Sequence, residues 1–191
     1  MANGRQSAVR ELDVLSAAYA CFTRHGLHRT TMEDIARELR RTRPVVYRFV
    51  TDKNDAFRKV AANMLKTATA AAGDAARRDG TVAERVFGIL DVKLGVAVKL
   101  HRDSPHHAEA LLAEDTRLIA DLAQDYIQAL TDLTVGVLVE TLPVAVARER
   151  TDILLALTRG LESDLKDPDR ARRLLREAIV LICPEIADRP P

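Results

Sequence analysis

The fold of this chain is decided by residues 30–53, TTMEDIARELRRTRPVVYRFVTDK. The apolar residues of the first half recur at helical spacing, at Met32, Ile35 and Leu39. Asp34 stands three residues after Thr31, so the threonine can cap a helix while the carboxylate reaches back to it. The pattern predicts a short helix over about 31–39.

A second short helix is predicted over 43–49. Arg40-Arg41 interrupts the apolar pattern, and Thr42 offers another N-cap. Pro44 lies in the first turn, where the missing N–H of proline does no harm. Isolated helices this short are marginal, so the two need to pack together. In DNA-binding proteins such a pair presents its second helix to the major groove.

Further helices are predicted on both sides of this pair. A helix over about 8–25 precedes it, ending at Gly26, and Thr51-Asp52 caps another that starts at Lys53. The later helices are expected near 53–78, 82–102, 106–141, 146–165 and 168–182. The 106–141 stretch reads as one helix or as two, with a second start at Glu114-Asp115-Thr116. No useful period-two alternation occurs, so the fold is expected to be all-α.

Composition agrees with a helix-rich cytoplasmic protein. Of the 191 residues, 47% are hydrophobic and 30% charged, with only 8 glycines and 7 prolines. The longest uncharged run, 14–23, has ten residues, whereas a membrane span needs about 20, so we expect no contact with a membrane. Cys21 and Cys183 stand far apart in apolar stretches and are expected to be reduced core thiols.

Charge is distributed unequally between the two ends of the chain. Residues 1–60 hold 12 Lys and Arg against 7 Asp and Glu, whereas residues 61–191 hold 17 against 21. A positive excess suits a phosphate-binding surface, because neutralised phosphates release their condensed counterions. Many basic faces are merely solvated, so charge alone does not decide the function.

The stretch Thr30–Ala36, together with Val46–Val50 and Lys53, resembles the N-terminal domain of the tetracycline-repressor (TetR) family. The resemblance covers residues 10–60. It implies a three-helix helix-turn-helix domain for DNA over 1–54, and a helical ligand-binding and dimerisation domain over 55–191.

The resemblance also implies roles for individual residues. Thr31, Tyr47 and Lys53 are expected to contact phosphates, which position the domain without reading sequence. Residues 43–45 are expected to face bases, and Arg48 to read a base or hold a phosphate. The complete set of expected DNA contacts is Thr31, Arg40, Arg41, Thr42, Arg43, Pro44, Val45, Tyr47, Arg48 and Lys53.

Two arginines depart from the family pattern in the turn between the short helices. The family usually has glycine at the position of Arg40, where the backbone is left-handed, and a small apolar residue at the position of Arg41. An arginine in that conformation costs of the order of 1 kcal/mol. We expect the two cations to strengthen phosphate attraction, with a turn that is wider than usual as one possible geometry.

In the second part of the chain the resemblance implies a homodimer built from the last two helices. Apolar stripes along 153–161 and 174–182 fit a four-helix interface between two copies, with an intramolecular bundle as the alternative. Gly160 in mid-helix suggests that a helix crosses closely there. The expected interface residues are Ile153, Leu157, Gly160, Leu161, Leu174, Ala178 and Leu181.

The resemblance also implies a small-molecule pocket in this part, and its effector is expected to be mostly apolar because the lining is aliphatic apart from Phe87 and Tyr126. The candidate lining is Phe87, Leu90, Leu94, Val98, Leu118, Leu122 and Tyr126, each of which also suits an ordinary core. His101, Asp103, His106, His107 and Glu109 have metal-ligand chemistry, but Pro105 interrupts their helix. We read them as a solvated loop and expect no metal and no cofactor.

These features favour a homodimeric transcriptional repressor that a ligand releases from operator DNA. The alternatives are a small helical enzyme or carrier, and a regulator controlled by a partner protein. No phosphate-cradling glycine loop, zinc spacing or convincing Ser-His-Asp set occurs, so we do not expect an enzyme.

Overall fold

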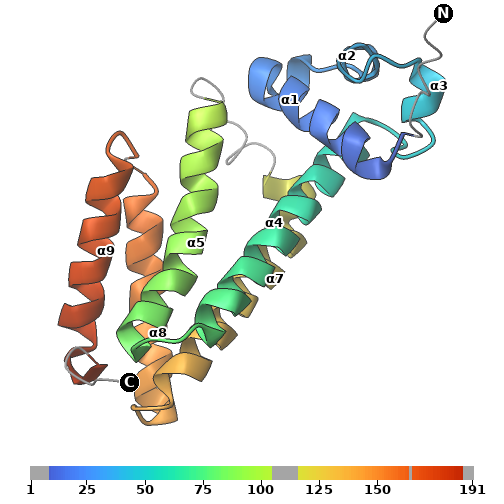
Figure 1. The fold of residues 1–191 in the computed structure, drawn as a ribbon. Helices are drawn as coiled ribbons and strands as arrows, with labels where there is room; N and C mark the ends of the chain where they lie inside the picture. Colours follow the sequence, from blue (N-terminus) through green and yellow to red (C-terminus); the bar gives the residue numbers. More distant parts are fainter. Residues whose placement is uncertain (1–8, 105–115, 164, 187–191) are drawn as a thin grey trace, which may run out of the picture. The chain divides into compact units, whose positions relative to one another are not determined.

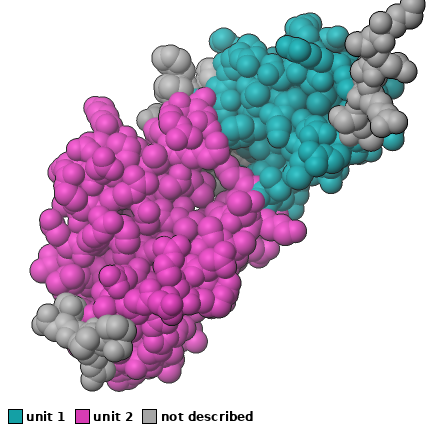
Figure 2. Space-filling model, viewed as in Figure 1, with its two compact units in different colours: residues 1–63, 104–120 teal, residues 64–103, 121–191 magenta. Residues whose placement is uncertain are grey.

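The computed structural model describes residues 9–104, 116–163 and 165–186. Within these residues the structure contains α-helices and one short 3-10 helix but no strand, so the predicted all-α fold is confirmed (Figure 1). The chain divides into two compact units, residues 1–63 with 104–120 and residues 64–103 with 121–191 (Figure 2).

Unit 1 contains α1 (Glu11–Arg29), α2 (Met32–Glu38), α3 (Arg43–Val46) and the start of α4 (Lys53–Arg77). Its core is apolar, and the rings of Phe22 in α1 and Phe57 in α4 meet edge to face with centroids 5.6 Å apart. Other buried members are Val14, Leu15, Ile35, Val46 and Val50. The helices on either side of α2 and α3 therefore hold this short pair in place.

Gly26 interrupts α1 where the sequence predicts a stop. Its φ of 75° and ψ of 161° lie outside the helical region, in a conformation that glycine adopts without steric cost. A further turn follows to Arg29, and the N–H of Thr30 bonds the carbonyl of Gly26 at 3.2 Å. The break thus lies at the predicted residue, although helical structure continues four residues beyond the predicted end.

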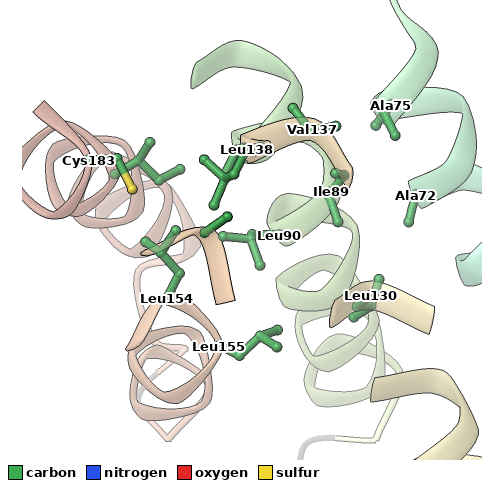
Figure 3. Packing of buried hydrophobic residues seen from close by; sticks show 14 of the residues in the cluster. Ala72, Ala75, Ile89, Leu90, Leu130, Val137, Leu138, Leu154, Leu155 and Cys183 are labelled. Atoms are coloured by element: carbon green, nitrogen blue, oxygen red, sulfur yellow. The ribbon is translucent and has the colours of Figure 1, made fainter. Parts of the chain in front are cut away.

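Unit 2 contains the rest of α4, together with α5 (Val82–Asp103), α7 (Thr116–Leu138), α8 (Val144–Leu161), α9 (Pro168–Ile182) and a 3-10 turn at Pro184–Ile186. Helix α7 begins at Thr116, where the sequence offered a second helix start within 106–141. Its first residues belong to unit 1. Residues 105–115 lie outside the described part of the chain. Figure 3 shows the core, where side chains of several helices converge; it includes Ile89, Leu90, Leu130, Leu138, Leu154 and Cys183.

Small residues let α4 and α5 approach closely in unit 2. A Cβ added to Gly88 would lie 3.0 Å from the Cβ of Ala75, tighter than normal side-chain packing. Ala68, Ala72 and Ala76 continue the buried face of α4. This part of α4 is therefore held along its length by the helices of unit 2.

A few polar groups lie inside the apolar core of unit 2. Lys93 of α5 is buried and forms an ion pair with Glu162, which follows α8. Tyr126 of α7 is also buried, its hydroxyl has no hydrogen-bond partner in the described structure, and burial raises the pKa of that hydroxyl. Thr134, further along the same helix, has a second unpartnered hydroxyl. The interior is therefore not uniformly apolar.

Both cysteines are buried free thiols, as the sequence predicts. Burial, and to a lesser extent the carboxylates of Glu38 and Asp34, raise the pKa of Cys21 to about 11. The thiol therefore stays protonated near neutral pH. Across the described residues, no helix combines the length and apolarity that a membrane crossing requires.

Candidate nucleic-acid interface

Helix α2 begins with the predicted capping box. The N–H of Asp34 donates to Oγ1 of Thr31 at 3.2 Å, and the N–H of Thr31 donates to Oδ2 of Asp34 at 3.0 Å. The threonine hydroxyl also donates to that carboxylate, at 2.6 Å, and these bonds lower the pKa of Asp34. A phosphate at the exposed Thr31 would therefore compete with Asp34 for the hydroxyl proton.

The turn after α2 is tight even though Arg40 occupies it. Arg40 has a φ of 55°, in the left-handed region that glycine favours. Its N–H bonds the carbonyl of Arg37 at 3.0 Å, and the N–H of Arg41 bonds the carbonyl of Ala36 at 2.9 Å. This pair of bonds is the Schellman arrangement that ends many helices. The wider turn considered from the sequence is therefore not found.

Helix α3 is shorter than predicted, because it ends at Val46 rather than at 49. The N–H of Phe49 bonds the carbonyl of Val46, so the last turn is tightened to a three-residue spacing. β-Branched and aromatic residues around this point have low helix propensity. Thr42 precedes the helix with extended backbone but makes no side-chain capping bond, unlike the predicted N-cap. Pro44 lies in the first turn as expected.

One face of α3 is open to solvent. Val46 is fully buried, whereas Thr42, Arg43, Pro44 and Arg48 are exposed, and Tyr47 is 42% exposed. Val45, predicted to point outward, is only half-buried and contributes less surface than its neighbours. Lys59 of α4 donates to the carbonyl of Phe49 at 2.6 Å and so fixes the end of this segment.

Arg43 and Tyr47 act as a connected pair on that face. The guanidinium Nη2 donates to the hydroxyl of Tyr47 at 3.0 Å, and its Cζ lies 5.6 Å from the ring centroid. Glu33 of α2 lies 4.0 Å from Nε of Arg43. The bond to Tyr47, with smaller contributions from the charges of Tyr47 and Glu33, raises the pKa of Arg43. Glu33 was not singled out from the sequence, because its proximity depends on the angle between α2 and α3.

Lys53 joins the start of α4 to the end of α1. Its Nζ donates to the carbonyls of Leu27 at 3.1 Å and His28 at 2.8 Å. Asp52 caps α4 by accepting from the N–H of Asp55 at 2.8 Å, as predicted for this break. An ammonium has three N–H donors, so one remains for an external acceptor.

A second group of basic residues, not predicted from the sequence, lines a cleft of about 200 Å³ in unit 1. Arg24, His25 and Arg29 of α1 form it together with Asp34 of α2. The sequence could have indicated this basic group, because all three basic residues lie shortly before Thr31, which was itself predicted to contact a phosphate.

The seven residues proposed for an effector pocket fall in both units. Leu118 belongs to unit 1, where its carbonyl accepts a 2.7 Å bond from Arg58, whereas the other six belong to unit 2. Leu90 and Leu94 are fully buried in the core. Phe87 instead lines a cavity of about 660 Å³ formed by α4, α5 and α9. That cavity also has charged lining, including Arg78, Arg85, Asp91 and Arg176.

The residues proposed for a dimer interface differ in exposure. Ile153 of α8 is 43% exposed, and Leu181 of α9 is 80% exposed. A Cβ added to Gly160 would meet nothing within 4 Å in the described structure, so the close crossing suggested by the sequence is not made by the described residues. Leu157, Leu161 and Leu174 are half-buried, and Ala178 is buried within the single chain.

The candidate metal-ligand cluster is only partly described. His101 makes a 3.0 Å contact through Nδ1 with the carbonyl of Ala97 in its own helix. His106, His107 and Glu109 lie outside the described residues. In the described ranges, no three His, Cys, Asp or Glu residues lie together in a way that could hold a metal ion.

Comparison with known proteins identifies the first unit. Residues 14–60 match the model of the bacterial regulatory proteins of the tetR family. No curated protein matches the sequence.

Solved structures extend the likeness to the fold of almost the whole chain. A transcriptional regulator from Rhodococcus sp. is 17% identical with a TM-score of 0.74, covering 92% of this chain and 97% of its own. A TetR-family transcriptional regulator from Streptomyces coelicolor is 15% identical with a TM-score of 0.67, covering 93% and 95%. SmeT in its complex with triclosan is 20% identical with a TM-score of 0.63, covering 90% of both chains.

Proposed function

Starting from an N-terminal helix-turn-helix domain of the tetR family of bacterial regulatory proteins, we propose that this chain is a homodimeric repressor released from its operator by a small molecule. The observation that carries the proposal is the exposed surface of α3 and the residues just after it, where Arg43, Tyr47 and Arg48 follow the basic turn at Arg40-Arg41. We place the protein in the cytoplasm, where it meets DNA.

DNA recognition divides between positioning and reading. Thr31, Tyr47 and Lys53 bind backbone phosphates, while Arg43 reads a guanine through its N7 and O6. Tyr47 also orients Arg43 through their 3.0 Å hydrogen bond, so it supports base reading indirectly. Arg40 and Arg41 add positive charge next to the reading helix. The half-buried Val45 offers a smaller apolar contact to a thymine methyl group.

Dimerisation is supported by the apolar face of α8 and α9. Leu181 and Ile153 are exposed, although large apolar side chains of this kind are usually covered. The open space at Gly160 leaves room for a partner helix. Two copies bring two α3 helices to successive major grooves, which is how symmetric dimers read paired half-sites.

Effector control is supported by the cavity at Phe87 in unit 2. Its volume of about 660 Å³ falls within the usual range for small-molecule sites. Its mixed lining favours a ligand with polar groups as well as an apolar body. The complex of SmeT with triclosan is an example of a protein of this fold that holds a small molecule.

Helix α4 is the element through which the effector acts in this proposal, because one continuous helix runs from Lys53 to Arg77. A ligand that changes its tilt changes the spacing of the two α3 helices. Since half-sites lie a fixed helical repeat apart, a small change in spacing costs much affinity.

DNA selection from a random pool, followed by titration of the selected site, tests the function. We expect specific binding that weakens steeply as salt rises. Arg43→Ala should cost about 1 to 3 kcal/mol on the selected site and relax one base position. Lys53→Ala should weaken binding to all sequences alike. Binding no tighter than to random DNA would refute the proposal and favour a helical carrier or enzyme.

A further inference from the structure

The cleft formed by Arg24, His25, Arg29 and Asp34 contains two basic side chains that make no hydrogen bond or ion pair in the described structure. His25 and Arg29 are exposed and form no hydrogen bond or ion pair there. Arg24 is held by Glu38 of α2 at 2.9 Å. Two of the three basic side chains are thus free to bind something from outside.

The acidic residue of the cleft is already fully engaged. Oδ2 of Asp34 accepts two bonds from Thr31, and its Oδ1 accepts from Arg37 at 3.1 Å. Each carboxylate here, that of Asp34 or of Glu38, therefore has its own arginine. The guanidinium of Arg29 has no carboxylate partner among the described residues.

The cleft has the size and donors that a phosphate group requires. Its volume of about 200 Å³ is too small for a drug-sized ligand but admits a tetrahedral anion with its water. The planar guanidinium of Arg29 can donate two parallel bonds to phosphate oxygens, and the imidazole of His25 can donate another.

We propose that this cleft binds a backbone phosphate of DNA, as an additional anchoring point beyond the contacts of α3. The inference rests on the proposed function, since it takes the bound polymer to be DNA. It assigns Arg29 and His25 as positioning residues that carry no base preference. Because Thr31 follows Arg29 by two residues, the cleft extends the phosphate-binding surface along the end of α1.

A thermodynamic cycle tests the contact directly. Affinity is measured for wild-type and Arg29→Gln protein on operators in which one phosphate at a time is replaced by a neutral methylphosphonate. If Arg29 binds one phosphate, neutralising that phosphate weakens the wild type several-fold but leaves the variant almost unchanged. Arg29→Gln should also reduce the slope of log affinity against log salt by about 1 on specific and random DNA alike.

Arg77→Gln is the matched control, because it removes an exposed arginine of unit 2 that lies outside the cleft. For this variant, the loss of affinity caused by neutralising any one phosphate should equal the loss measured for the wild type, so the two changes are additive. Additive behaviour of Arg29→Gln at every phosphate overturns the proposal, whether or not inorganic phosphate binds the free protein. A titration of free protein with inorganic phosphate, followed by NMR of the His25 ring, identifies a cleft that takes the free ion instead.

These outcomes separate the inference from the proposed function. A protein that selects its operator but shows an additive cycle keeps its function and loses this contact. A protein that selects no DNA refutes both the function and the DNA phosphate at the cleft.

Discussion

At the scale of the residue, Arg40 has a left-handed backbone conformation, which is disfavoured for any residue with a Cβ atom. With a φ of 55° it completes the hydrogen bonds that end α2, a place where glycine would be free of steric cost. Retention of the tight turn means that the strain is borne by this residue and not relieved by a wider loop. If the turn lies against DNA, the positive charge of Arg40 explains why this chain has arginine where the family usually has glycine.

Arg40→Gly should therefore stabilise the protein and weaken DNA binding. We expect the free energy of unfolding to rise by up to about 1 kcal/mol in urea titrations. The salt dependence of DNA binding should lose about one unit of slope. Arg37→Gly, at a helical position of α2, is the control and should destabilise by about 1 kcal/mol. A loss of stability in Arg40→Gly would contradict the left-handed turn.

Two fully buried threonines in unit 2 differ in whether the side-chain hydroxyl has a hydrogen-bond partner. Thr134 has no partner in the described structure, whereas Thr151 donates to the carbonyl of Ala147 at 2.8 Å. Both are fully buried in helices. Thr134→Val should raise the free energy of unfolding by about 1 kcal/mol, because it removes an unpaired polar group. Thr151→Val should not raise it, and equal effects of both variants would contradict the distinction.

At the scale of the element, the capping box of α2 makes its stability dependent on pH. Hydrogen bonds from Thr31 lower the pKa of Asp34 in the folded protein. Such a group stabilises the fold above its unfolded pKa, and the contribution disappears as pH falls through the lower folded value.

Asp34→Asn should thus be less stable than the wild type at neutral pH, with the difference shrinking in strongly acidic solution. Urea titrations at a series of pH values check this. Asp74→Asn, which removes a carboxylate from an exposed ion pair with Arg77, is the control and should cost less stability at neutral pH than Asp34→Asn. A difference between Asp34→Asn and wild type that stays constant down to acid pH would contradict the assignment.

Features of these elements that depend on neighbouring residues could be predicted from the sequence, whereas features that depend on residues far apart in the chain could not. The cap at Thr31 and the break at Gly26 follow from local chemistry, and both were found at the predicted residues. The end of α3 at Val46 was missed, because the turn after it is fixed partly by Lys59, ten residues beyond Phe49. The bond from Arg58 to the carbonyl of Leu118 could not be predicted, because it joins residues sixty positions apart.

At the scale of the whole molecule, the proposed dimer makes a clear prediction about Leu181. This side chain is 80% exposed, so Leu181→Asp should leave the fold of a single subunit intact. If α9 lies in the dimer interface, the buried charge should drive dissociation, which light scattering coupled to size exclusion measures. DNA affinity should fall with it, because a monomer reads one half-site.

Leu12→Asp is the matched control for that experiment, since Leu12 is a leucine of α1 with 53% exposure outside the proposed interface. It should leave the oligomeric state unchanged. A Leu181→Asp protein of wild-type mass in solution would exclude this residue from the interface and return the intramolecular bundle as the explanation for the apolar stripes.

The bond between Lys53 and the carbonyls of Leu27 and His28 has a consequence for the energetics of association. A lysine that meets DNA from a freely rotating state gives up much side-chain conformational entropy. Lys53 has already given up part of that entropy on folding, because two of its N–H groups are fixed before any ligand arrives. Its contact with a phosphate should therefore come at a smaller entropic cost than that of an unrestrained surface lysine.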